Sequence, residues 1–134
     1  MTRVDQWERR FYEVLEAAAS RPLAYGQHDC ALFVAQCIKA ITGADFGDRF
    51  RGTYKTSREA FAVCQAHGSL EALVTARLGP PGPPRRAKRG DIVAIPHARF
   101  GLSLGVCDGL SGIFIGQGGF LIAPRQEFSM SWPV

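Results

Sequence analysis

The sequence predicts an α+β domain in which N-terminal helices pack on a C-terminal antiparallel sheet. Apolar residues recur at helical spacing up to about residue 78, and from about residue 90 they form short runs separated by glycine turns. Between the two parts lies a stretch that can be neither helix nor central strand, Gly79-Pro80-Pro81-Gly82-Pro83-Pro84. The 134 residues suffice for one domain with a core. We therefore expect a single domain over 1–134, with a helical part at about 5–78, a connector at 79–86 and a sheet at about 90–134.

Two helices are predicted in the first third of the chain. The first is amphipathic and carries apolar residues at helical spacing: Trp7, Phe11, Val14, Leu15 and Ala18. Pro22 ends it. The second opens near Cys30, with Asp29 as its expected N-cap, and ends at Thr42-Gly43. Because this second helix is apolar on most sides, we expect it to be the central, buried one.

Two shorter helices are predicted after an irregular loop over 43–56. Thr56 followed by Glu59 is a capping-box pattern, which marks the start of a third helix. Gly68 suits its C-terminal end, and Ser69 can cap a fourth helix that ends near Leu78.

The rest of the chain is predicted to be an antiparallel meander. The expected strands are Asp91 to Ile95, ended by Pro96, then Gly101 to Cys107, Gly112 to Gly116, Phe120 to Ala123, and an edge strand within Phe128 to Val134. Asp108-Gly109 and Gly118-Gly119 supply the turns between the later strands.

Composition excludes a membrane-spanning protein, because no apolar run approaches the roughly 20 residues that a span needs. The N-terminus passes directly into the amphipathic pattern, so we expect no signal peptide and synthesis in a cytoplasm. The four cysteines are then expected to be reduced thiols.

The net charge of +4 is concentrated in one loop, which carries Arg85, Arg86, Lys88 and Arg89 and no acidic residue. No aromatic residue is interleaved there to stack on bases, so we expect no nucleic-acid partner. Two interpretations of these basic residues remain: they form a solvated loop, or they contact an acidic partner.

The placement of Cys30 resembles the papain-like fold, in which a cysteine opens a buried helix that packs on a later antiparallel sheet. The local residues resemble the NlpC-type branch of small bacterial and phage cell-wall peptidases. In that family a Tyr and a Gly-containing loop precede Asp-Cys, as Tyr25, Gly26, Asp29 and Cys30 do here. A Gly-Asp pair opens the first core strand, as Gly90-Asp91 does here. The resemblance implies that Cys30 stands at the position of the catalytic nucleophile.

The catalytic base of that family has no counterpart here. Its next strand reads His-Val-Gly-Ile, whereas this chain has Ser103-Leu104-Gly105-Val106, and a serine cannot accept a proton at neutral pH. Ser103 therefore marks the position of the missing histidine. His97 is the candidate substitute base, and Gln117 is the candidate for the third catalytic residue. Cys30 is either a nucleophile or a small residue at a helix start.

A closer resemblance is to a family of short phage and prophage proteins of the same fold. It rests on an early tryptophan and a C-terminal Trp-x-Val, and on the following motifs in order: Tyr25-Gly26-x-x-Asp29-Cys30, Thr42-Gly43-x-Asp45, Arg51-Gly52-x-Tyr54 and Arg89-Gly90-Asp91. Such proteins are typically encoded among late tail genes. The resemblance implies a tail-tip or baseplate role, a location in the virion tail, and other tail-tip proteins as partners, with peptidoglycan as a further candidate.

The sequence hypothesis is thus a structural or assembly component of a phage-like tail tip, with a degenerate cysteine-peptidase fold. The alternative is an active cysteine hydrolase, a peptidoglycan endopeptidase or amidase that uses Cys30. We expect the basic loop, the Pro-rich connector and the C-terminal strand to face partners, and Trp132 either anchors a partner or folds back on the domain. Cys64 and His67 are three residues apart on one predicted helix, a spacing that can bind a metal. The favoured interpretation is instead a core cysteine and a histidine placed at the helix end by the helix dipole. We therefore expect no metal and no cofactor.

Overall fold

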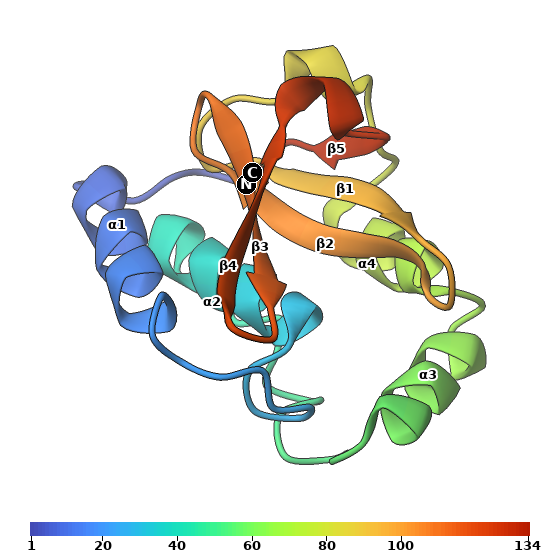
Figure 1. Ribbon diagram of the computed structural model, residues 1–134. Helices are drawn as coiled ribbons and strands as arrows, with labels where there is room; N and C mark the ends of the chain where they lie inside the picture. The colour runs from blue at the N-terminus through green and yellow to red at the C-terminus, as the bar shows by residue number, and fades with distance from the viewer.

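Four helices fill the N-terminal half of the chain and a five-stranded sheet the C-terminal half, which confirms the predicted α+β class (Figure 1). The structure is a computed structural model that describes all residues, 1–134. The helices are α1 (Trp7–Ala18), α2 (Cys30–Thr42), α3 (Ser57–Ala66) and α4 (Leu70–Leu78). The strands are β1 (Ile92–His97), β2 (Gly101–Cys107), β3 (Ser111–Gly116), β4 (Gly119–Pro124) and β5 (Met130–Trp132), and two short 3-10 helices are η1 (Pro84–Arg86) and η2 (Arg125–Glu127).

The predicted helix caps are confirmed at three helices. Side-chain oxygens of Asp29, Thr56 and Ser69 each accept a hydrogen bond from the main-chain N–H three residues further on. These bonds satisfy N–H groups that have no partner within the helix. At the other end of α2, Gly43 adopts φ 86°, a left-handed conformation that glycine takes without strain.

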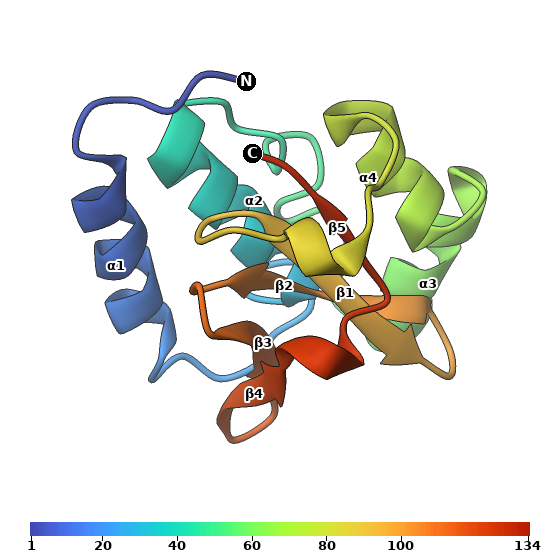
Figure 2. The same ribbon diagram turned by 90° about the horizontal axis from the view of Figure 1, so that it is seen from above.

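The strands form one antiparallel sheet in the order β4-β3-β2-β1-β5. α1 packs on α2, and α2 and α4 both contact β2 (Figures 1 and 2). The main core therefore lies between these helices and the sheet, and it includes Phe33 and Cys37 of α2 and Leu104 of β2, all fully buried. A smaller apolar cluster covers the opposite face around Phe114 and Phe128.

Pro96 does not end the first strand as expected, because β1 continues to His97. β5 accompanies β1 only from Ile92 to Ala94, so beyond that point this side of β1 is an open edge. Pro96 lacks an N–H and is tolerated where no ladder bond is needed.

Further boundaries differ from the prediction by one residue, since β1 begins at Ile92 rather than Asp91 and β3 at Ser111 rather than Gly112. The turn before β4 is Gln117-Gly118, and Gly119 already pairs with Gly116 as the first residue of the strand. The Pro-rich connector is tied to the sheet, because Gly82 and Ser131 exchange main-chain hydrogen bonds of 2.7 and 3.2 Å.

The C-terminal strand faces the core rather than a partner. Trp132 is fully buried, and its indole N–H donates to Thr75 Oγ1 at 3.4 Å. This corrects the expectation of a partner-facing strand, because burying an indole ring of this size stabilises the fold itself. None of the helices has the length and apolar character needed to cross a membrane.

Candidate functional site

The start of α2 is held by a buried carboxylate at Asp29. Its Oδ1 accepts from the N–H of Leu32 at 2.9 Å, and its Oδ2 accepts from the N–H of Gly26 at 3.0 Å and from the hydroxyl of Tyr54 at 2.6 Å. Asp29 is 4% exposed, so these three donors replace the water that an ionised carboxylate needs. Asp29 is a structural cap, as the sequence favours, and it joins the start of α2 to the adjacent loop at Gly26 and to the distant Tyr54.

Gly26 and Tyr54 meet so closely that a side chain at residue 26 has no room. A Cβ atom built on Gly26 would lie 1.8 Å from the carbonyl oxygen of Tyr54, and Gly26 has φ 84°. The carbonyl of Gly26 also accepts from the N–H of Gly52 at 2.8 Å. These contacts give a physical reason for the Tyr25-Gly26 and Gly52-x-Tyr54 patterns.

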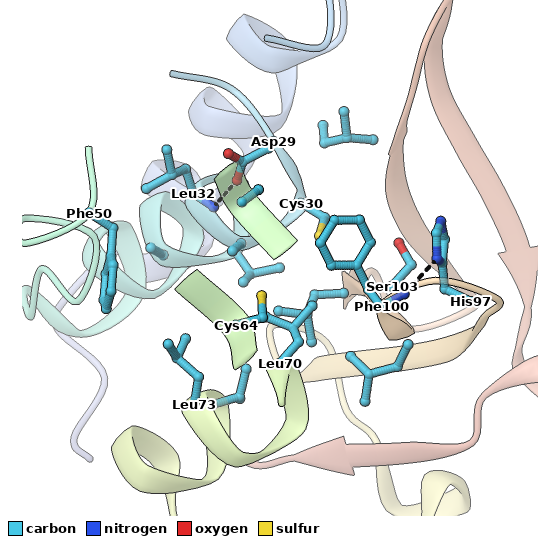
Figure 3. Close-up of a pocket in the computed structure, with 18 of the residues that line it drawn as sticks. Asp29, Cys30, Leu32, Phe50, Cys64, Leu70, Leu73, His97, Phe100 and Ser103 are labelled. Atoms are coloured by element: carbon cyan, nitrogen blue, oxygen red, sulfur yellow. Dashed lines mark hydrogen bonds between the residues drawn. The ribbon is translucent and has the colours of Figure 1, made fainter. Parts of the chain in front are cut away.

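The thiol of Cys30 lies on the wall of a pocket in front of α2 (Figure 3). Burial raises its pKa to about 11, and the neighbouring negative charge of Asp29 acts in the same direction. The main-chain amides of Leu104 and Ala31 lower the pKa by less than burial raises it. The helix start therefore does not activate this thiol, because desolvation of the thiolate outweighs the nearby N–H groups.

Ser103 lies where strands β2 and β3 separate. Their ladder contains only three pairs, Gly105 with Phe114, Val106 with Ile113 and Cys107 with Gly112. Ser103 and Leu104 come just beyond the last pair and line the pocket near Cys30. Ser103 is half-buried and its hydroxyl makes no hydrogen bond within the chain. Ser103 is thus part of the pocket wall.

His97 stabilises the β1–β2 hairpin instead of the Cys30 thiol. Its Nδ1 accepts from the N–H groups of Arg99 and Phe100, both at 3.2 Å, which places the ring proton on Nε2. No hydrogen bond joins the imidazole to Cys30. Figure 3 shows Cys30, Phe100, Ser103 and His97 in this order across the pocket, with His97 beyond Ser103.

Gln117 lines the same pocket from the exposed turn between β3 and β4. Its side chain makes no hydrogen bond to His97 or to any other residue of the chain. Cys30, His97, Ser103 and Gln117 therefore share one pocket, but hydrogen bonds do not link them into a catalytic relay.

His28 is the buried histidine that the site does not use. Its main chain exchanges hydrogen bonds with Ala24, at 2.7 and 2.9 Å, but its ring Nε2 has no partner. The ring is 2% exposed and packs edge-on against Phe33 with centroids 6.2 Å apart. Burial lowers the pKa of His28, and the charge of Arg21 adds to this effect. Both effects favour the neutral form of the imidazole.

Cys64 and His67 do not form a metal site. Cys64 lines the pocket, whereas His67 Nδ1–H donates to the carbonyl of Val63 at 3.0 Å, and the ring packs edge-on against Phe50. No group of three or more potential ligands among His, Cys, Asp and Glu comes together anywhere in the chain.

A family described as "Domain of unknown function (DUF6950)" matches residues 2–134 of this chain. The chain belongs to this family. The match covers the Asp29 cap, Cys30 and all five strands of the DUF6950 domain. No curated protein matches the chain.

The feature of the DUF6950 domain that sequence reasoning missed is the pocket itself. It is a cavity of about 480 Å³, and 24 of its 32 lining residues are hydrophobic. Three helices and two hairpins contribute to the wall, so no local pattern in the sequence marks it. Cys64, Tyr54 and Arg77 also line it. We call it the central cavity.

The reactivity of Cys30 gives a direct check of this geometry. At pH 7 we expect about a hundredfold less thiolate than for a thiol whose pKa is 9.0, since the pKa of Cys30 is about 11. The rate of iodoacetamide labelling at Cys30, followed by peptide mass spectrometry, should still be rising at pH 10. His97→Ala should leave this pH profile unchanged while destabilising the hairpin by about 1 kcal/mol. A labelling pKa near 7 that rises in His97→Ala would contradict the structure.

Proposed function

We propose that this chain is a non-catalytic form of the papain-like, NlpC-type cell-wall peptidase fold. The observation that carries the proposal is the state of Cys30, whose raised pKa and lack of a hydrogen-bonded imidazole leave it without an activated thiolate. A cysteine nucleophile needs an adjacent base or a lowered pKa, and Cys30 has neither.

The arrangement around Cys30 supports the finer fold assignment. Cys30 opens a helix whose apolar face packs on β2, and Ser103 lies on that strand at the wall of the same cavity. A thiol at a helix start opposite an antiparallel strand is the plan of the papain-like fold, with the serine in place of the base.

We further propose that the chain is a structural or assembly component of a phage-like tail tip and resides in the virion tail. The basic loop supports a partner surface: Arg85, Arg86, Lys88 and Arg89 are all exposed, and none takes part in an ion pair. A cluster of exposed positive charges without ion-pair partners in the chain favours an acidic partner.

The basic loop is also fixed in shape. The guanidinium of Arg125 donates to the carbonyls of Arg85 and Ala87, at 3.2 and 2.8 Å, and to the carbonyl of Gly109 at 3.3 Å. Ala87 is buried beneath the loop. A loop held in this way presents its cations with little ordering cost on binding, which favours recognition of a partner surface.

The proposal is tested in the phage or prophage that encodes the chain. Deleting the gene should yield particles with incomplete tail tips in electron micrographs, and both the wild type and Cys30→Ala should restore them. Arg86→Glu with Arg89→Glu should not restore them, because charge reversal opposes an acidic partner. Arg49→Glu with Arg58→Glu, which reverses exposed unpaired cations elsewhere, is the matched control and should restore them.

A peptidoglycan cleavage assay, combined with the complementation by Cys30→Ala, tests the alternative of an active hydrolase. Purified wild-type protein should release no peptide from peptidoglycan. Cleavage that is lost in a folded Cys30→Ala variant, together with failure of this variant to restore tail tips, would overturn the proposal.

A further inference from the structure

The central cavity is bordered on one side by α3. Of the residues of α3 only Ala60 is buried, while Val63 and Cys64 are half-buried and line the cavity. Figure 3 shows Cys64 at the cavity. The inner face of α3 therefore borders the cavity, and Cys64 also packs against the main core. A mainly apolar pocket of about 480 Å³ lies in the size range of small-molecule sites in proteins, which indicates room for a ligand.

The volume of the cavity and the length of its lining fit a ligand with a hydrocarbon chain. Its lining runs from Cys30 to Ile38 along α2 and from Leu70 to Leu78 along α4, which is about 12 Å of each helix axis. An apolar cavity of about 150 Å³ stays dry and admits benzene, a six-carbon molecule. A volume of about 480 Å³ is roughly three times larger, enough for ten or more carbons in a row.

The charges at the wall indicate the polar end of that ligand. Arg77 and Asp29 are the only lining residues with a formal charge at neutral pH. Both oxygens of Asp29 already accept hydrogen bonds within the chain, whereas Arg77 is exposed and makes no ion pair or hydrogen bond. A guanidinium beside an apolar cavity matches a carboxylate attached to a hydrocarbon chain.

We propose that the central cavity binds one unbranched acyl chain of about ten carbons, whose carboxylate pairs with Arg77 at the end of α4. The apolar lining holds the hydrocarbon part, and Cys30 and Cys64 contribute to this lining as neutral, soft side chains. This inference does not depend on the tail-tip role, and the two proposals are tested by separate experiments.

Decanoate is the probe, and calorimetry with purified full-length protein is the measurement. The wild type should bind one decanoate per chain. Arg77→Gln should weaken binding about tenfold, and decanol should bind the wild type about as weakly as decanoate binds this variant. Decanoate should also slow maleimide labelling of Cys64.

Two tryptophan variants on one helix separate filling of the cavity from general effects. Val63→Trp fills the cavity and should abolish binding, while Ala62→Trp places the same ring on the exposed side of α3 and should leave binding unchanged. Circular dichroism checks that both variants fold.

Absence of saturable decanoate binding by the folded wild type would overturn the inference and leave an apolar segment of a protein partner as the occupant. Equal binding by Val63→Trp and the wild type would place the ligand outside the cavity and overturn it as well. Equal affinity for decanoate and decanol would overturn the pairing with Arg77.

Discussion

Gly26→Ala is expected to lose more than about 4 kcal/mol of unfolding free energy, a large share of what a domain of this size has. The added Cβ would overlap the carbonyl oxygen of Tyr54, at 1.8 Å, and both partners are main chain that cannot rotate away. Relieving the overlap would separate Gly26 from Gly52 and Tyr54 from Asp29, which breaks hydrogen bonds of 2.8 and 2.6 Å. Urea denaturation at equilibrium measures the loss.

Gly43→Ala is the matched control for this prediction. Gly43 has nearly the same φ as Gly26, 86° against 84°, but a Cβ there meets nothing within 4 Å. Only the backbone strain remains, so we expect a loss of about 1–2 kcal/mol. Equal losses for the two variants would show that the close approach of Tyr54 does not matter.

Asp29→Ala is expected to lose about 3–5 kcal/mol, because it removes a helix cap and also leaves buried donors unpaired. The hydroxyl of Tyr54 and the N–H of Gly26 are both buried, and both would lose their acceptor within the chain. The amide of Leu32 loses its cap at the same time. Thermal and urea denaturation should agree on the size of the loss.

Thr56→Ala removes a cap of the same kind at an exposed site and serves as the comparison. The hydroxyl of Thr56 accepts from the N–H of Glu59 at 3.1 Å and has no bond to a distant segment. Its loss should cost about 1 kcal/mol. If Asp29→Ala costs no more than this, the bridge from α2 to Tyr54 contributes nothing to stability.

Local chemistry explains why most elements could be predicted from the sequence. The caps Asp29, Thr56 and Ser69 act within four residues, and Gly43 ends a helix through its own backbone, so neighbouring residues suffice to place α2, α3 and α4. The prediction that β1 ends at Pro96 was wrong because the tolerance for proline depends on a neighbouring strand, β5.

The candidate site shows the same division between local and distant effects. The sequence places Cys30 at a helix start and Ser103 in the matching strand, since both follow from short motifs and strand order. A helix start by itself favours a lowered thiol pKa. Only the tertiary structure decides that the pKa is raised instead, because burial depends on the residues of α3, β2 and β3 that surround the sulfur.

The sequence by itself determined the α+β order, the helix caps, the central helix and the absence of a histidine at residue 103. The tertiary structure alone decided that Trp132 is buried, that His97 caps a hairpin and that a cavity of about 480 Å³ lies beside Cys30. The physical reason is the separation in sequence of the residues that interact. Hydrogen bonding at caps and turns is set by adjacent residues. Burial depends on whether segments far apart in the chain pack together, and a cavity forms where they do not fill the space between them.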